Sequence, residues 1–155
     1  MLAIYNHAVV HTTATYDYEP RTLAQRLEWF DDHERERWPV FVAEDGPGTV
    51  VGWSSLSRYH QKPGYQFTAE NSVYLAESHR GRGLGARLLT PLITAAGERG
   101  LHAILAVIDA DNRASLRLHA RFGFEQVGRF KQIGFKFGRW LDVIYLEKLL
   151  PPPVP

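Results

Sequence analysis

The 155-residue sequence contains no cysteine. Disulfides, thiolate metal ligands and a thiol nucleophile are therefore excluded, and the composition agrees with a reducing cytoplasm, where we expect the protein to act. No apolar run approaches the roughly 20 residues that a membrane-spanning helix needs. The N-terminus also lacks the basic and then apolar pattern of a secretion signal. We therefore expect no membrane association.

Charge of one sign is not in excess either, because 18 Lys and Arg face 17 Asp and Glu, for a formal net charge of +1. Basic residues are spread along the chain, except in a loop near residue 80 and between Arg113 and Arg121, so we expect no nucleic-acid partner. Among seven histidines, His7 and His11 are the only helical i, i+4 pair. No glutamate lies between them as in zinc proteases, and we expect no metal.

Hydrophobic residues make up 45% of the chain, which is enough for one globular domain over residues 1–150. The proline-rich tail 151–155 can continue neither a helix nor a strand. Hydrophobic spacing and turn residues predict the elements in this order: helices over 2–10 and 21–37, paired strands over 40–43 and 50–53, a strand within 65–77, a helix from 84 to 99, a strand over 102–108, a helix over 112–122, and closing strands over 124–131 and 140–149.

The helix predicted over 21–37 carries Leu23, Leu27 and Phe30 at helical spacing, which indicates an amphipathic helix.

A basic glycine loop lies between the strand within 65–77 and the next helix. It reads Arg80-Gly81-Arg82-Gly83-Leu84-Gly85-Ala86. Bare backbone N–H groups at a helix N-terminus favour an anion, most naturally a pyrophosphate. Gly81-x-Gly83-x-x-Ala86 also fits the dinucleotide fingerprint, with Asp109 where a ribose-binding acid would follow. That alternative is disfavoured because four residues separate strand from loop and too few strand–helix units remain; a plain strand-to-helix turn stays possible.

Together with its neighbours, this loop resembles that of the GNAT superfamily of acetyl-CoA-dependent N-acetyltransferases. Their pattern of Gln or Arg, two residues, Gly, one residue, and Gly or Ala is filled by Arg80, Gly83 and Gly85. The family's second block follows at the expected spacing, with Asn112, Ser115, His119 and Gly123-Phe124.

Longer segments resemble the phosphinothricin and methionine sulfoximine acetyltransferase branch over nearly the whole chain. These are Thr68-Ala69-Glu70-Asn71-Ser72-Val73-Tyr74-Leu75, the early Asn6-His7, Thr12-Thr13 and Glu19-Pro20, and the late Gly134-Phe135-Lys136 with Trp140 and Asp142-Val143. The resemblance implies a three-layer α/β/α fold with a mixed, mostly antiparallel central sheet. Members of this branch usually begin with a strand before the first helix, whereas Met1 here falls at about the start of that helix. We therefore expect the first strand to be missing. Either the start of the sequence is truncated, or the sheet lacks that edge strand.

The same resemblance implies a site for acetyl-CoA. Arg80 and the segment Gly81, Arg82, Gly83, Leu84, Gly85 and Ala86 would hold the pyrophosphate. The backbone of Val73, Tyr74 and Leu75, splayed from the next strand, would bind the pantetheine arm and face the thioester oxygen. Asn112 and Ser115 would lie near the pantetheine and thioester, although Ser115 is equally an ordinary helix residue.

Two residues are candidates for proton transfer. Glu70 lies in mid-strand, where an acid needs a partner or a task, and the resemblance favours a general base over an exposed strand residue. His119 is a candidate acid for the departing CoA thiolate, although a structural histidine is equally compatible with the sequence.

For the acceptor we expect Tyr16, His60 and Lys62, together with Glu70, Asn71 and Ser72. A small amino acid needs a cation for its carboxylate, and the sequence leaves open which one serves, because the segment before Glu70 also reads as an ordinary loop.

The expected reaction is acetyl transfer from acetyl-CoA to the primary amine of a small amino-acid-like acceptor by direct attack. A protein or peptide N-terminus as acceptor, and a non-catalytic CoA-binding module, are the alternatives. The apolar C-terminal strands favour a homodimer, as in the resembling family.

Overall fold

The computed structural model describes residues 1–151. Its elements are α1 (Leu2–His11), α2 (Leu23–Arg35), β1 (Val40–Glu44), β2 (Val50–Arg58), β3 (Thr68–Leu75), α3 (Leu84–Glu98), β4 (Ala103–Asp109), α4 (Arg113–Arg121), β5 (Glu125–Lys136) and β6 (Arg139–Leu149), with single 3-10 turns at Pro63–Tyr65 and Glu77–His79. Within these residues the sheet has six strands in the order β1-β2-β3-β4-β6-β5. Only β3 and β4 pair in parallel, which confirms the mixed, mostly antiparallel sheet.

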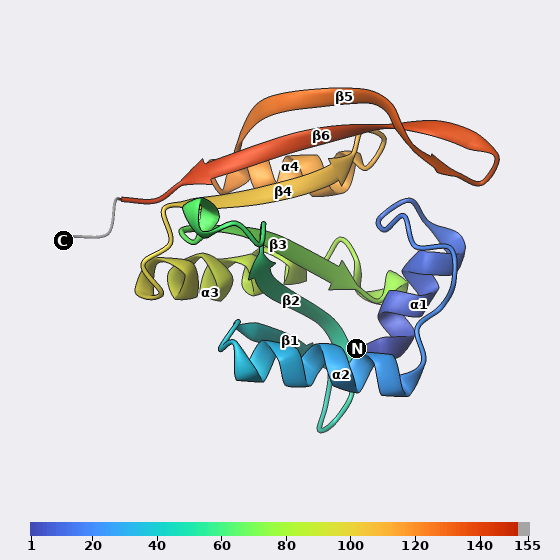
Figure 1. Cartoon of the computed structure of the whole chain (residues 1–155). Coiled ribbons are helices and arrows are strands. Elements are labelled where there is room, and N and C mark those ends of the chain that lie inside the picture. Colours follow the sequence, from blue (N-terminus) through green and yellow to red (C-terminus); the bar gives the residue numbers. More distant parts are fainter. Residues whose placement is uncertain (152–155) are drawn as a thin grey trace.

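Helices cover both faces of this sheet (Figure 1). On one face α3 packs over β2, where the hydroxyl of Ser54 donates to the carbonyl of Leu88. On the opposite face the indole of Trp53 meets Tyr5 of α1 and Trp29 of α2. Successive strand residues point to opposite faces, so Ser54 and Trp53 mark the two layers. The predicted three-layer arrangement is confirmed.

The apolar core lies mainly between the sheet and α3. Leu56 and Leu89 are fully buried, and Leu92 and Ile104 are 1% exposed. Gly85 lets α3 and α4 approach closely, since a Cβ there would lie 2.9 Å from the side chain of Leu118. The N-terminal end of α3 is thereby fixed against the rest of the domain.

Strands β3 and β4 separate part-way along their length. Their parallel pairing covers Thr68↔Ala103, Ala69↔Ile104 and Glu70↔Leu105 and then stops. Both strands continue beyond that point, β3 to Leu75 and β4 to Asp109. The backbone of β3 after Glu70 therefore faces an opening instead of a neighbouring strand.

Helix α2 presents a face that its hydrophobic spacing does not predict. Leu23 is 62% exposed and Leu27 53%, whereas Arg26 and His33 are buried. The helix is also shorter than predicted, because Thr22 and Gln25 form a reciprocal capping box that begins it at Leu23. An apolar stripe thus remains on the surface, and a basic residue occupies the position that faces the sheet.

Helix α1 is the first element among residues 1–151. No helix in this described part is both long and apolar enough to cross a membrane. Residues 152–155, most of the predicted proline-rich tail, lie outside the described residues.

Candidate active site

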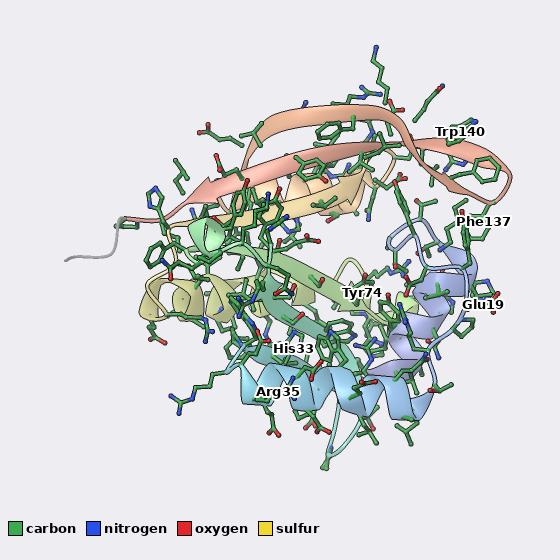
Figure 2. The ribbon with its side chains drawn as sticks, in the orientation of Figure 1. Glu19, His33, Arg35, Tyr74, Phe137 and Trp140 are labelled. Carbon is green, nitrogen blue, oxygen red and sulfur yellow. The ribbon has the colours of Figure 1, made fainter. Side chains whose placement is uncertain are left out.

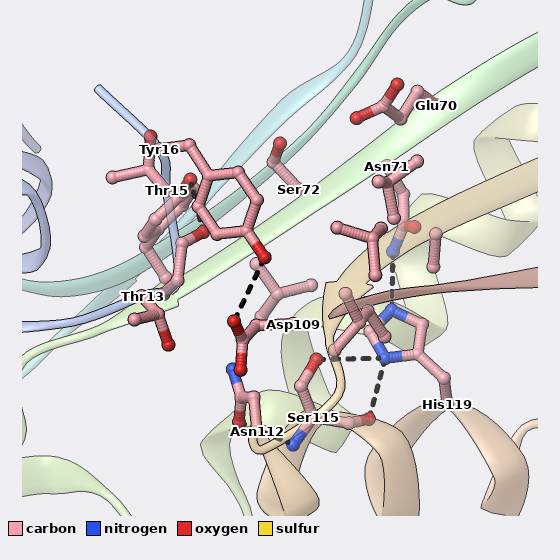
Figure 3. A pocket seen from close by; sticks show the side chains of 17 residues that line it. Thr13, Thr15, Tyr16, Glu70, Asn71, Ser72, Asp109, Asn112, Ser115 and His119 are labelled. Carbon is pink, nitrogen blue, oxygen red and sulfur yellow. Dashed lines mark hydrogen bonds between the residues drawn. The ribbon is translucent and has the colours of Figure 1, made fainter. Parts of the chain in front are cut away.

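A pocket of about 260 Å³ lies where β3 and β4 separate (Figure 3). One wall is the segment 70–74 of β3, and the other is 106–109 of β4 with the start of α4. The segment between α1 and α2 closes the remaining side. Most of the lining is polar, namely Thr13, Thr15, Tyr16, Glu70, Asn71, Ser72, Tyr74, Asp109, Asn112, Ser115 and His119.

Glu70 is the last residue of β3 that pairs with β4. Its carboxylate forms no hydrogen bond or ion pair within residues 1–151, and burial raises its pKa above the usual glutamate value. A carboxylate in this state accepts a proton more readily near neutral pH than an exposed one does. The structure therefore places the predicted base in the pocket without a cation that would hold it ionised.

His119 lies opposite, 3% exposed, with both ring nitrogens in contact with protein groups. Its Nδ1 is 2.9 Å from the carbonyl oxygen of Ser115, which only accepts, so Nδ1 carries the proton. Its Nε2 then accepts from the Asn71 amide at 2.9 Å. Burial lowers the pKa of His119, which favours this neutral form. In this arrangement His119 connects α4 to β3 and has no proton directed at the pocket.

The hydrogen bond to His119 holds the Asn71 side chain through its amide nitrogen and leaves the amide oxygen unused. Its side-chain oxygen is buried and has no hydrogen-bond partner among the described residues. Asn71 lines the pocket, so a buried acceptor without a partner lies beside it.

The neutral, buried state of His119 predicts a pH dependence of stability. His33 is also buried with a lowered pKa. Below about pH 6.5 these histidines bind a proton in the unfolded chain, whereas their lowered pKa keeps them neutral in the folded chain. The free energy of unfolding therefore decreases as pH falls. We expect Tm to drop by a few °C between pH 7.5 and 5.5, and His119→Gln to reduce that slope. Thermal denaturation across this range measures it; an unchanged slope in the variant would contradict the neutral assignment.

Tyr16 stands at the mouth of the pocket. Its hydroxyl donates to the carboxylate of Asp109 at 2.9 Å, and the other oxygen of Asp109 accepts from the backbone N–H of Asp111. Asp109 therefore orients Tyr16 and the turn into α4, which is not the ribose-binding role of the dinucleotide alternative. Lys136, buried in β5, donates to the carbonyl oxygens of Thr12 and Thr15 and fixes the same segment from the other side.

The glycine loop has the geometry of an anion site. Gly81 and Gly83 have φ of 74° and 78°, a conformation that glycine adopts readily, and a Cβ at either position would meet nothing within 4 Å. No backbone N–H from Gly81 to Gly85 bonds to a carbonyl in the described residues, and the first turn of α3 holds no acid. Arg80, Arg82 and Arg87 are exposed around it. These features fit a pyrophosphate at the N-terminus of α3.

The structure does not bring all predicted acceptor residues to the pocket. His60 and Lys62 are exposed in the β2–β3 connection, where the backbone N–H of Lys62 donates to His60 Nδ1. Neither lines the pocket, whereas Tyr16, Glu70, Asn71 and Ser72 do. The sequence did not indicate the roles of Asp109 and Lys136, because their partners are more than 90 residues away. Within the described residues, no group of three His, Asp or Glu could hold a metal ion.

Residues 2–124 match the Acetyltransferase (GNAT) family. The chain belongs to this family. It is 45% identical over 152 residues to the L-methionine sulfoximine/L-methionine sulfone acetyltransferase of Pseudomonas aeruginosa, covering 98% of this chain and 88% of that protein. It is 40% identical to the phosphinothricin N-acetyltransferase of Streptomyces coelicolor, over 95% and 87% of the two chains.

A solved acetyltransferase of Salmonella typhimurium, described with its cofactor acetyl-CoA, superposes with a TM-score of 0.96 at 38% identity, covering 99% of this chain and 88% of that one. These relatives confirm the predicted N-acetyltransferase class and the predicted resemblance to the phosphinothricin and methionine sulfoximine branch.

Proposed function

We propose that this GNAT acetyltransferase, as a single catalytic domain over residues 1–150, transfers the acetyl group of acetyl-CoA to the primary amine of methionine sulfoximine, methionine sulfone or phosphinothricin. The observation that carries this proposal is Glu70, a half-buried carboxylate without a counter-charge among the described residues, at the point where β3 leaves β4. The small pocket beside it, about 260 Å³, suits a single amino acid.

The loop and the separated strand would hold the donor. Backbone N–H groups from Gly81 to Gly85 bind the pyrophosphate, supported by Arg80 and Arg82, and the pantetheine arm follows β3 from Leu75 to Val73 into the pocket. Acetyl-CoA supplies the activated acyl group when bound. The oxygen of Asn112 caps α4 by accepting from the N–H of Ser115, and its amide N–H groups remain to donate to acetyl-CoA.

Proton transfer begins at the acceptor, which arrives as an ammonium ion. Glu70 takes its proton through a water, the free amine attacks the thioester carbonyl, and backbone N–H groups of the separated part of β3 stabilise the developing oxyanion. The tetrahedral intermediate then collapses with cleavage of the C–S bond, and the proton lost by the new amide nitrogen balances the one taken up by the CoA thiolate, which leaves as the thiol. The sequence predicted His119 as the acid for the thiolate. Its hydrogen bonds favour a positioning role instead, in which it holds the Asn71 side chain and so fixes the segment of β3 beside Glu70.

Release of CoA thiol across a panel of amines tests the proposal. With acetyl-CoA we expect turnover on methionine sulfone, methionine sulfoximine and phosphinothricin, and little on peptides of several residues. Turnover on peptides alone would instead make the protein an N-terminal acetyltransferase. Acetyl-CoA binding by calorimetry without thiol release from any amine would leave a non-catalytic CoA-binding module.

Two apolar surfaces support a homodimer. The β5–β6 hairpin exposes Phe130, Phe135, Phe137 and Trp140, the last two visible at its tip in Figure 2, and α2 exposes Leu23 and Leu27. Patches of this kind on soluble proteins mark interaction sites. Sedimentation of the wild type and of Trp140→Asp tests this. If the dimer interface buries the hairpin, the charge introduced at position 140 should convert the dimer to a monomer. The enzyme would act in the cytoplasm, where acetyl-CoA is available.

A further inference from the structure

A second pocket, of about 300 Å³, lies on the α1/α2 face of the sheet. It shares Ser72 and Tyr74 with the pocket that contains Glu70, so the two are neighbours along β3. Its lining comes from α1, α2, the segment before α2 and strands β2 and β3, and consists of Tyr5, Arg21, Gln25, Arg26, Trp29, Trp53, Ser55, Ser57, Ser72 and Tyr74.

Arg26 is the unusual member of this lining. It is only 9% exposed, its side chain forms no ion pair or hydrogen bond within residues 1–151, and its buried Nε has no partner. Its guanidinium carbon lies 4.6 Å from the ring centre of Tyr5, 4.7 Å from that of Trp29 and 5.2 Å from that of Trp53. The rings orient the guanidinium and give it partial electrostatic compensation, but they supply no counter-anion.

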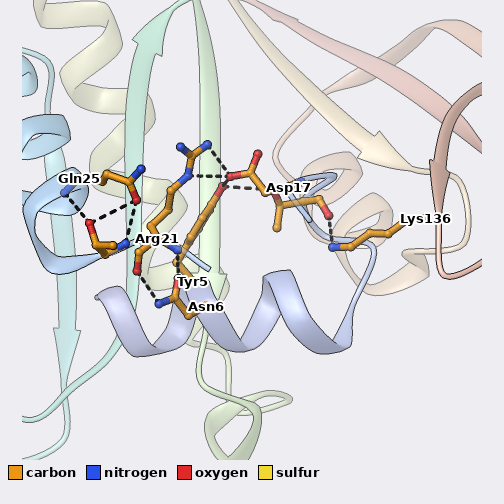
Figure 4. A network of polar contacts seen from close by, with 8 residues as sticks. Tyr5, Asn6, Asp17, Arg21, Gln25 and Lys136 are labelled. Atoms are coloured by element: carbon orange, nitrogen blue, oxygen red, sulfur yellow. Dashed lines mark hydrogen bonds and ion pairs between the residues drawn. The ribbon is translucent and has the colours of Figure 1, made fainter. Parts of the chain in front are cut away.

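The pocket offers donors and no acid. Besides Arg26, its polar lining is Gln25, three serine hydroxyls, tyrosines and Arg21, and the indole N–H of Trp53 is buried without a partner among the described residues. Arg21 is already neutralised by Asp17 at 2.7 Å (Figure 4). A buried cation without a counter-charge is destabilising, and a carboxylate that binds it bidentately removes that cost. The pocket therefore has the chemistry of an anion site.

The strand register relates this cation to the base. Trp53 pairs with Tyr74, Ser55 with Ser72, and Ser57 with Glu70, all on the same face. Four residues of strand separate the row of Arg26's aromatic partners from the row of Glu70, roughly 13 Å. One hydrogen bond would join Glu70 to a bridging water, a second would join that water to the amine of the acceptor, and a third would join the carboxylate of the acceptor to the guanidinium of Arg26. At about 2.9 Å each, these three hydrogen bonds cover most of that length. The short amine-to-carboxylate separation of an α-amino acid covers the rest.

We infer that Arg26 binds the α-carboxylate of the acceptor, with the amine directed past Ser72 toward Glu70. This inference rests on the proposed acetylation of an amino acid and names the cation that recognises it. It assigns a task to a basic residue on the buried side of α2, whereas the exposed His60 and Lys62 line neither pocket.

Methionine sulfone and its primary carboxamide, which lacks the negative charge, test this inference with acetyl-CoA as donor. We expect the wild type to prefer the acid, and Arg26→Gln to raise KM for the acid by about 10- to 100-fold, as for one lost charge-assisted contact. KM for the carboxamide and the affinity for acetyl-CoA should change little. Arg99→Gln is the matched control, because Arg99 stacks on Trp38 at 4.0 Å and lines neither pocket.

The possible results separate the two proposals. An Arg26→Gln enzyme that keeps the wild-type preference for the acid overturns the role of Arg26 and leaves the proposed function intact. If none of the amino acids tested supports release of CoA thiol by the wild-type enzyme, the proposed function itself is refuted. If Arg26→Gln does not fold, Arg26→Lys replaces it, and tryptophan fluorescence of the wild type supplies a second readout through Trp29 and Trp53. Equal titrations with the acid and the carboxamide would then refute the inference.

Discussion

Replacing Glu70 by glutamine is expected to lower kcat by about 100- to 10,000-fold, the usual contribution of a positioned general base. Glutamine keeps the size and hydrogen-bonding capacity of the side chain but accepts no proton, so the ammonium form of the acceptor is not converted to the nucleophile. Because Glu70 contacts no residue through a side-chain hydrogen bond or ion pair within residues 1–151, the fold should be retained. Steady-state kinetics and calorimetric titration with acetyl-CoA measure the two effects.

The pH profile gives an independent test of the same residue. Burial raises the pKa of Glu70, so the acid limb of kcat/KM should lie above the ordinary glutamate pKa of about 4.3, with activity lost as pH falls through it. The residual activity of the variant should lack that limb. Glu98→Gln, at the exposed end of α3, should behave as the wild type. A Glu70→Gln enzyme with normal kcat would remove Glu70 from the mechanism.

The second large effect is expected from Gly134→Ala in β5. A Cβ at this position would overlap the ring of Tyr16, with Cδ2 only 2.8 Å away and Cε2 closer still. The ring cannot withdraw without breaking its hydrogen bond to Asp109 at the mouth of the active-site pocket. Overpacking of this kind costs about 1–3 kcal/mol. We expect a lower Tm and a kcat/KM reduced by about 5- to 100-fold, measured by thermal denaturation and by thiol release.

Gly128→Ala is the matched control on the same strand. A Cβ at Gly128 would meet only the Cβ of Tyr145 at 3.9 Å, an ordinary van der Waals contact. Neither glycine has a positive φ, so the two substitutions differ in the neighbour they meet and not in backbone strain. If both variants lose activity equally, the position of Tyr16 is not what Gly134 protects.

The two effects also report on different parts of catalysis. Loss of Glu70 should act on kcat, because the proton is removed in the chemical step, whereas displacement of Tyr16 should act on acceptor KM as well, because Tyr16 forms the wall that the acceptor passes. Lys136 supports the same wall from β5, since its ammonium group donates to the carbonyl oxygens of Thr12 and Thr15. The β5–β6 hairpin therefore contributes to the site although it carries no reacting group.

Features that depend on local backbone geometry could be predicted from the order of the residues alone. Gly81 and Gly83 at positive φ, the turn at Asn112 and the apolar run of β4 each involve only a few adjacent residues, whose conformational preferences do not need a distant partner. The glycine loop and its helix indicate an anion site, and together with the strand before the loop and the block from Asn112 to Phe124 they carry the family resemblance that implies acetyl-CoA.

The buried side of α2, by contrast, depends on the sheet beneath it. Hydrophobic spacing favoured Leu23 and Leu27, but the sheet presents Trp53 and Tyr74, and the aromatic face of Trp53 accepts the guanidinium of Arg26. A helix buries the side that matches its neighbour, and no local pattern in α2 describes that neighbour.

The protonation state of His119 has the same kind of origin. It depends on the Ser115 carbonyl within α4 and on Asn71, 48 residues away in β3. Contacts between segments far apart in the chain set burial, charge compensation and proton positions, because each depends on the surface that the other segment supplies. The donor could therefore be inferred from the sequence, whereas the inferred cation for the acceptor required the fold.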